Sequence, residues 1–304
     1  MIDVLIIGSG ALANAYAARL SSSDICRLQI LGSWQEGIQA IHKRGIQLDE
    51  QGIINSIPPI FATTNIAEIQ PAKLILLLVK SWQTKQLAPL LKQKLQNDGV
   101  CLTLQNGLGN LEILQVVFGR ENANAGTTTL GATLVAPGKV KILANGSMLI
   151  GEHASTAWLI PLFQKHSFEI QSHPDLQSVL WGKLLINAII NPLTALLSVE
   201  NGALEKDGQT LLLVDAMIDE ILSVLAAKQI NLPYASPHQK VREIIHESGR
   251  NHSSMFQDMQ RNAPTEIEFI TGAILREAGA LNLHLPVNET IYRLVKSKII
   301  LNKN

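Results

Sequence analysis

The chain opens with a strand pattern, a glycine-rich turn and a helix pattern, and this order limits the folds available to it. Ile2–Ile7 is apolar and rich in β-branched residues, Gly8–Ala13 reads G-x-G-x-x-A, and a helical pattern covers Asn14–Leu20. The first glycine permits a tight turn, the second lets a pyrophosphate approach the backbone, and Ala13 permits close helix–strand packing. The helix N-terminus presents N–H groups and a positive dipole end to phosphates. We therefore expect an α/β dinucleotide-binding domain, the alternative being a purely structural glycine turn.

Further strand patterns each end in polar residues. Leu74–Val79, the most apolar run, is followed by Lys80, and Val100–Leu104 is followed by Asn106-Gly107. In α/β folds the ligand lies at the carboxyl ends of the strands, so both positions are candidate binding residues. Asn-Gly is also a good sequence for a plain turn. Other expected elements are a strand at Arg27–Leu31, a helix at Gln35–Arg44, a strand near Gly45–Leu48, a third polar strand end at Gly126–Ala132, and a hairpin of Lys139–Leu143 with Met148–Gly151.

After residue 174 the pattern changes to helices alone. This change predicts two domains, an α/β Rossmann-type domain over 1–174 and an all-α domain over 175–304. A chain of 304 residues is also long for a single core. The expected helices are Asp175–Leu197, Gln209–Gln229, Ser236–His246, Thr265–Ala280 and Val287–Ile300.

The first of these helices contains polar residues among apolar ones. In Trp181–Leu197, Lys183, Asn187 and Asn191 are spaced four apart and form one slowly drifting stripe. A lysine in such surroundings is costly unless it is paired or opens onto a wet cleft, and we expect the stripe to face a cleft between the domains. The alternative is an amphipathic helix whose Lys183 reaches out to water. Pro192 should end or kink the helix.

Two further polar features lie near the C-terminus. Asn251–Asp258 is a dense polar run, for which a solvated loop is an equal interpretation. Glu266 is expected in the opening turn of a helix, where acids are favoured by the helix dipole alone. Taken singly, both features favour a structural role.

Composition excludes several classes of function. The 25 basic and 25 acidic residues balance, which gives no electrostatic footprint for nucleic acid or an anionic membrane. The two cysteines are far apart, and no cluster of metal ligands is visible, so we expect neither disulfide nor metal site. No apolar run has the length of a membrane span, and the N-terminus lacks the features of a signal peptide, so the expected compartment is the cytoplasm.

Together the motifs resemble one family. GSGALA, LLLVKS, LQNGLGN, GTTTLGA, WGKLLINAIINPLTAL and NHSSMFQDMQRNAPTEIEFITGAIL, followed by LPVN, occur in the order and at the separations of 2-dehydropantoate 2-reductases (ketopantoate reductases). The resemblance runs from about residue 3 to residue 298. It implies NADPH-dependent reduction of 2-dehydropantoate to (R)-pantoate, on the route to vitamin B5 and coenzyme A.

The resemblance also implies roles for particular residues. Lys183 would be the general acid, and Glu266 would close the site beside it on the cofactor side. Substrate contacts would come from Asn106, Asn187, Asn191, Asn201, Asn251, Ser253 and, foremost, Ser254. The cofactor, NADP(H), would be lined by Gly8, Ser9, Gly10, Ala11, Leu12, Ala13, Lys80, Asn106 and Ala132.

The sequence departs from the family after the second strand. Family members commonly carry an Arg there, and this chain has Trp34. No acid selects NAD at this point, and Ser33 and Lys80 could contact a 2′-phosphate, so NADPH remains the expected cofactor. The alternatives are a reductase of another branched 2-oxo acid and a non-catalytic NADP(H) sensor. The sequence leaves the oligomeric state open, with a homodimer as one alternative.

Overall fold

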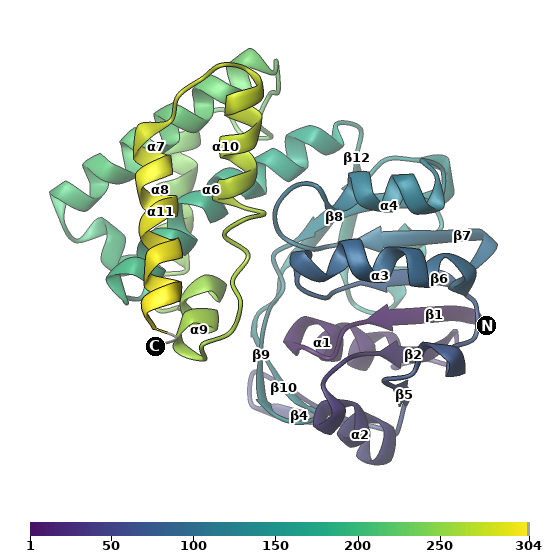
Figure 1. The fold of residues 1–304 in the computed structure, drawn as a ribbon. Coiled ribbons are helices and arrows are strands. Elements are labelled where there is room, and N and C mark those ends of the chain that lie inside the picture. Colours follow the sequence, from purple (N-terminus) through teal and green to yellow (C-terminus); the bar gives the residue numbers. More distant parts are fainter. Residues whose placement is uncertain (303–304) are drawn as a thin grey trace. The chain divides into compact units, whose positions relative to one another are not determined.

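A computed structural model describes residues 1–302 as two compact units (Figure 1). The first unit comprises Met1–Gln105 and Asn110–Leu176, and the second comprises Asn106–Gly109 and residues 177–302. The sequence placed the division at residue 174 and gave no sign that Asn106–Gly109 packs with the helical unit. The fold is an α/β unit with a mainly parallel sheet, followed by a helical unit, as the sequence predicted.

The first unit is built on an eight-stranded sheet. Its strand order is β12-β11-β8-β7-β6-β1-β2-β5, and the six strands from β8 to β5 are parallel. β11 runs antiparallel to β8 and parallel to β12. The strands are β1 (Ile2–Ile7), β2 (Cys26–Leu31), β5 (Phe61–Thr63), β6 (Ala72–Leu77), β7 (Leu95–Thr103), β8 (Ala123–Thr128), β11 (Ser147–Gly151) and β12 (Glu169–His173).

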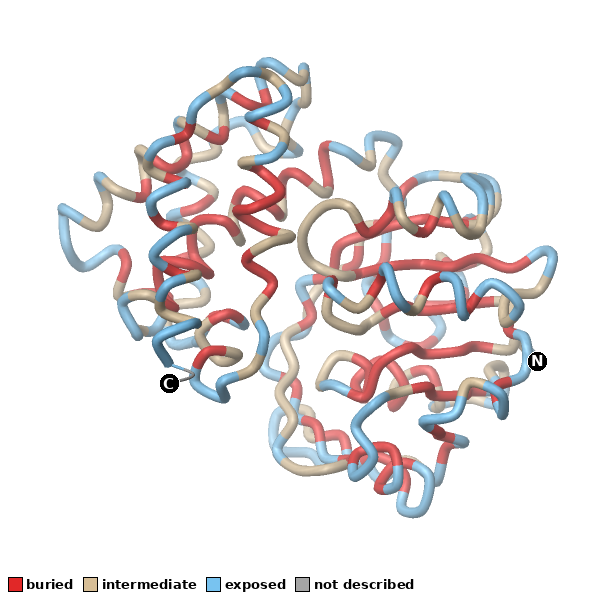
Figure 2. The backbone as a smooth tube through the Cα atoms, viewed as in Figure 1, coloured by how far each residue is buried: buried red, intermediate tan, exposed pale blue. Residues whose placement is uncertain are grey.

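The central strands are buried on both faces, which explains their unbroken apolar sequences. Val4 and Ile6 of β1 join a core cluster with Tyr16 and Phe163, and Leu5, pointing to the opposite face, is equally buried. Figure 2 shows this part of the chain as a continuous buried band. The helices of this unit are α1 (Ala11–Leu20), α2 (Gln35–Arg44), α3 (Thr84–Leu91), α4 (Asn110–Phe118) and α5 (Leu159–Lys165).

A second, four-stranded sheet overturns the predicted hairpin. Its order is β4-β3-β10-β9, where β3 is Ile46–Glu50, β4 is Ile53–Ile57, β9 is Gly131–Ala136 and β10 is Lys139–Ala144. β10 pairs with β3 and β9, whereas β11 pairs with β8 and β12, so β10 and β11 do not pair with each other. The chain crosses between sheets at Asn145-Gly146, where a Cβ on Gly146 would overlap the backbone of Thr129. Strands β4, β5, β9 and β12 were not predicted, and β4, which is exposed from Ile53 to Ser56, has no buried face to give a strand pattern.

The second unit consists of helices around the buried helix α6 (Leu176–Leu197). By length and mean hydropathy α6 alone among the described residues would suffice to cross a membrane, but 72% of that window is buried inside the protein, as in a core helix. The other helices are α7 (Gly208–Ala227), α8 (Pro237–Glu247), α9 (Ser254–Gln260), α10 (Thr271–Ala280) and α11 (Pro286–Leu301). Short 3-10 helices are η1 (Ile66–Glu68), η2 (Ser81–Gln83), η3 (Lys92–Lys94), η4 (Ala154–Thr156) and η5 (Asn201–Glu205).

The sequence predicted that Pro192 would end or kink the helix, and the first of these alternatives was wrong, because α6 continues beyond Pro192. Pro192 is buried within the helix, where packing on all sides outweighs one lost backbone hydrogen bond. The end of α6 is capped from α11, because Nζ of Lys298 donates to the carbonyls of Ala195 (2.9 Å) and Leu196 (2.8 Å). A cation at this position also complements the negative end of the helix dipole.

Helix α11 is held at its other end by Glu220 of α7. The carboxylate of Glu220 accepts from the backbone N–H of Val287 (2.8 Å) and of Asn288 (2.9 Å). An anion at a helix N-terminus stabilises it through these donors and through the dipole. We therefore expect Glu220→Gln to lower the free energy of unfolding by about 1–2 kcal/mol, measured by urea denaturation.

The matched control is Glu289→Gln, in the first turn of the same helix. Glu289 pairs on the surface with Arg293 (2.6 Å), so its loss should change the free energy of unfolding by less than about 0.5 kcal/mol. Equal losses in the two variants would show that the cap has no special contribution.

Candidate active site

The turn Gly8–Ala13 lies between β1 and α1, where its first glycine is required by geometry. Gly8 has φ +132°, and a Cβ there would lie 3.1 Å from the carbonyl oxygen of Leu78. Gly10 is exposed, and a Cβ there would meet nothing within 4 Å. The absent side chain of Gly10 therefore leaves the backbone open to a ligand, which is what a pyrophosphate needs.

Asn14 holds this turn in place, and sequence reasoning missed it. Its Nδ2 donates to the carbonyls of Ser9 (3.0 Å) and Gly10 (2.9 Å), while its side chain is 1% exposed. Gly10 is the N-cap of α1 and offers no side-chain cap. The first N–H groups of α1 are thus left for an anion, in the arrangement typical of dinucleotide sites.

At the end of β2, Trp34 is the N-cap residue of α2 and lies against that helix. A Cβ on Gly37 would be 2.6 Å from Cζ3 of Trp34, so the indole covers the position where a side chain would stand. The ring remains 38% exposed, and Ser33 beside it is exposed. A side chain at position 37 would therefore displace the Trp34 ring.

The remaining predicted cofactor residues of the first unit lie on different elements. Lys80 is the N-cap residue of η2 and lies three residues after the end of β6, which pairs with β1. Ala132 lies on β9, opposite Ile142 in the four-stranded sheet, and β9 packs against α1, the helix that follows the glycine turn.

In the second unit, three predicted residues from distant parts of the chain meet. Nδ2 of Asn106 donates to Oε2 of Glu266 (3.2 Å), and Oδ1 of Asn106 accepts from Nδ2 of Asn187 (3.3 Å). Lys183, one turn before Asn187 on α6, is half-buried and near enough to Glu266 to interact electrostatically. The ammonium of Lys183 and the amide of Asn187, one turn apart on α6, thus lie in one cluster with the carboxylate of Glu266.

Burial lowers the pKa of Lys183 from 10.5 to about 8, and the negative charge of Glu266 opposes this shift. Desolvation disfavours the charged ammonium, whereas a nearby carboxylate favours it. A lysine with this pKa exchanges a proton near neutral pH, which an exposed lysine does not.

Glu266 does not lie in a helix, contrary to the sequence prediction. It lies before α10, in the turn Glu266–Ile270. The carbonyl of Glu266 accepts hydrogen bonds from the backbone N–H of Phe269 (2.9 Å) and of Ile270 (3.0 Å), and these bonds form the turn. Only 5% of Glu266 is exposed. The helix dipole therefore does not explain this acid.

The predicted substrate residues divide into structural and exposed ones. Ser253 caps α9, with its Oγ accepting from Phe256 N–H (3.1 Å) and from Oγ1 of Thr194 (2.7 Å). Asn201 is 6% exposed and donates from Nδ2 to Oγ of Ser248 (2.9 Å). Of the others, Asn191 is buried on α6, whereas Asn251 and Ser254 are exposed.

Comparison with known proteins assigns the family. The sequence model of the family described as ketopantoate reductase PanE/ApbA matches residues 4–155, and that of its C-terminal part matches residues 175–299. The chain belongs to this family. It is a family of dinucleotide-binding oxidoreductases, and this membership agrees with the open glycine turn.

Individual relatives match this chain over nearly its full length. A 2-dehydropantoate 2-reductase of Vibrio cholerae is 29% identical over 300 residues, covering 97% of each chain. One from Pyrococcus horikoshii is 30% identical over 304 residues, covering 98% of this chain and 97% of the relative.

Solved structures extend the similarity to three dimensions. A PanE/ApbA family ketopantoate reductase from Ralstonia eutropha has a TM-score of 0.93 at 25% identity, covering 100% of both chains. D-mandelate dehydrogenase, solved with NADH and anilino(oxo)acetate, has a TM-score of 0.91 at 24% identity, covering 100% of both chains. At this identity the latter similarity concerns the fold alone.

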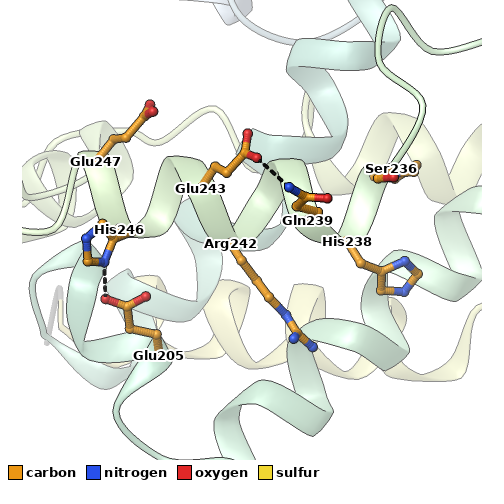
Figure 3. Close-up of a pocket in the computed structure, with 9 residues that line it drawn as sticks. Glu205, Ser236, His238, Gln239, Arg242, Glu243, His246 and Glu247 are labelled. Carbon is orange, nitrogen blue, oxygen red and sulfur yellow. Dashed lines mark hydrogen bonds and ion pairs between the residues drawn. The ribbon is translucent and has the colours of Figure 1, made fainter.

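A cleft on α8 contains none of the predicted residues (Figure 3). Its histidines and arginine pair with acids of neighbouring elements: His246 with Glu205 (3.0 Å), Arg242 with Asp215 (2.6 Å) and His238 with Asp219 (3.0 Å). These exposed pairs link α8 to α7 and η5, and each contributes little to stability. Within residues 1–302, no group of three or more His, Cys, Asp or Glu side chains could hold a metal ion.

The pairing of Lys183 with Glu266 predicts the effect of removing the acid. We expect Glu266→Gln to move the pKa of Lys183 below about 8, because the charge that favours the ammonium is lost while the burial remains. An NMR titration of protein labelled with ¹³C-lysine would measure it. In Glu277→Gln, which removes an acid paired with Lys228 (2.5 Å), the pKa of Lys183 should stay near 8. An unchanged pKa in Glu266→Gln would contradict the assigned pairing.

Proposed function

We propose that this ketopantoate reductase family member reduces 2-dehydropantoate to (R)-pantoate with NADPH. The observation that carries the proposal is the lowered pKa of Lys183, about 8, beside the carboxylate of Glu266. This is the tuning expected of a general acid that works near neutral pH. Support also comes from relatives named 2-dehydropantoate 2-reductase at 29% and 30% identity over nearly the full chain.

The residues of the glycine turn fit a dinucleotide. Gly10 leaves its backbone uncovered, and the first N–H groups of α1 have no side-chain cap. When bound there, a nicotinamide dinucleotide supplies the hydride that adds to the ketone carbon. The turn Gly8–Ala13, fixed by Asn14, would hold its pyrophosphate.

Lys183 would protonate the ketone oxygen. As the C=O double bond becomes single, negative charge develops on oxygen, and the ammonium both stabilises this charge and gives up its proton. Glu266 would keep Lys183 protonated between turnovers, because its charge raises the pKa that burial lowers. Asn187 and Asn106 would orient substrate or cofactor groups without adding net charge.

The substrate class is a 2-oxo acid with a branched, hydroxyl-bearing chain. Asn191, Asn251 and Ser254 remain candidates for its carboxylate and hydroxyl, on the strength of the family resemblance. Ser253 and Asn201 would contribute to substrate binding indirectly, by holding neighbouring segments in place. Ser253 caps α9, and Asn201 donates a hydrogen bond to Ser248. The exposed Ser254 remains the foremost direct contact.

The catalytic role is tested by replacing the lysine. We expect Lys183→Ala to lower kcat by roughly 10²–10⁴, the usual span for a lost general acid, with little change in cofactor binding. NADPH oxidation with a panel of 2-oxo acids measures the rate and identifies the substrate. The control is Lys240→Ala on the exposed face of α8, expected to retain the parent rate. A Lys183→Ala rate within threefold of the parent would refute the role, and a parent inactive on every 2-oxo acid would refute the function.

Cofactor preference is tested at Trp34. We expect the parent to prefer NADPH, and Trp34→Arg to increase the ratio of kcat/KM for NADPH to that for NADH, because a guanidinium binds a 2′-phosphate with two charged hydrogen bonds. Trp34→Phe, which keeps a ring over Gly37, should leave the ratio unchanged. A parent that prefers NADH would overturn the proposed cofactor. An unchanged ratio in Trp34→Arg would mean that residue 34 does not face the phosphate.

A further inference from the structure

Asn106–Gly109 connects two elements of the first unit yet packs with the second. Its neighbours are fixed in the first unit: Oγ1 of Thr84 donates to Oδ1 of Asn110 (2.8 Å) and accepts from Nε2 of Gln105 (3.0 Å). Between them, Leu108 packs against the helical core of the second unit.

Its attachment to the second unit is a backbone contact with the turn Glu266–Ile270. Leu108 N–H donates to the carbonyl of Phe269 (3.0 Å). Gly107, at φ +86°, faces the same carbonyl, and a Cβ there would overlap its oxygen and lie 2.6 Å from its carbon. Because real side chains do not approach a carbonyl this closely, only glycine, which has no Cβ, permits the contact.

The turn on the other side of this contact is braced and has little freedom to retreat. Oε1 of Glu268 accepts from the hydroxyl of Tyr292 (2.8 Å) and from Nζ of Lys296, both on α11. Nη2 of Arg276 on α10 donates to the carbonyl of Glu268 (3.0 Å). A side chain at position 107 would therefore displace Asn106–Gly109 rather than the turn.

We infer that Gly107 is a positioning residue, which sets the Asn106 amide against Glu266 and Asn187 by letting the carbonyl of Phe269 close on the segment. Asn106 makes its contacts at 3.2 Å and 3.3 Å, near the outer limit for such bonds, so a small displacement breaks both. The inference rests on the proposed function only for its kinetic test.

Gly109 supplies a matched control. It lies two residues further along the same segment at φ +94°, so alanine there incurs comparable backbone strain, but its Cβ would meet nothing within 4 Å. We expect Gly107→Ala to lower kcat/KM by about 10- to 100-fold, the scale of a misplaced site group, and Gly109→Ala to stay within threefold of the parent. Since Gly107 acts through the amide, Asn106→Ala/Gly107→Ala should be no slower than Asn106→Ala alone.

Amide hydrogen exchange at Leu108 tests the contact without activity. Protection should fall in Gly107→Ala and persist in Gly109→Ala, because only the former separates Leu108 N–H from Phe269. Equal losses of rate or protection in the two variants would overturn the inference, as would additive losses in the double variant. If the parent reduces no 2-oxo acid, the proposed function fails while the exchange comparison still decides this inference.

Discussion

The pairing of a half-buried ammonium with a buried carboxylate is the constraint on which the second unit depends. Lys183 is on a helix surrounded by apolar side chains, and Glu266 is 5% exposed. Removing either partner would leave a charge with little water around it. The lowered pKa of Lys183 means that folding favours the neutral amine. The charged ammonium therefore lowers the free energy of unfolding most below about pH 8, and this loss decreases as the pH rises above 8. The second unit thus retains a group whose charged form is costly at neutral pH.

Uncharged amides complete this arrangement. Asn106 joins Asn187 on α6 to Glu266 in the turn before α10, so three segments meet through one side chain. An acid in its place would repel Glu266, and a lysine would compete with Lys183 for it. The remaining structure keeps these segments still: Lys298 caps α6, Glu268 fixes the turn to α11, and Glu220 fixes α11 to α7.

The sequence predicted the parts whose signals are local. The central strands and the glycine turn follow from apolar runs and from two glycines at fixed spacing. The hairpin prediction failed because Asn145-Gly146 suits a tight turn equally well whether the flanking strands pair or enter different sheets. Pro192 did not end α6, because tertiary packing outweighed a local preference. The contact of Asn106 with Glu266 spans 160 residues, so no local pattern could reveal it, and only the family resemblance placed both in one site.

That separation has a consequence for how the chain acquires its structure on the ribosome. The sheet around β1, β6 and β7 can assemble from the first residues to emerge, but Asn106–Gly109 finds its partners only when the turn at Glu266 has been made. At about 5–20 residues per second, those 160 residues take on the order of 10–30 s. For that interval the nascent sheet carries an undocked segment at the edge expected to bind ligand. The first half can thus be folded well before Asn106 meets Glu266.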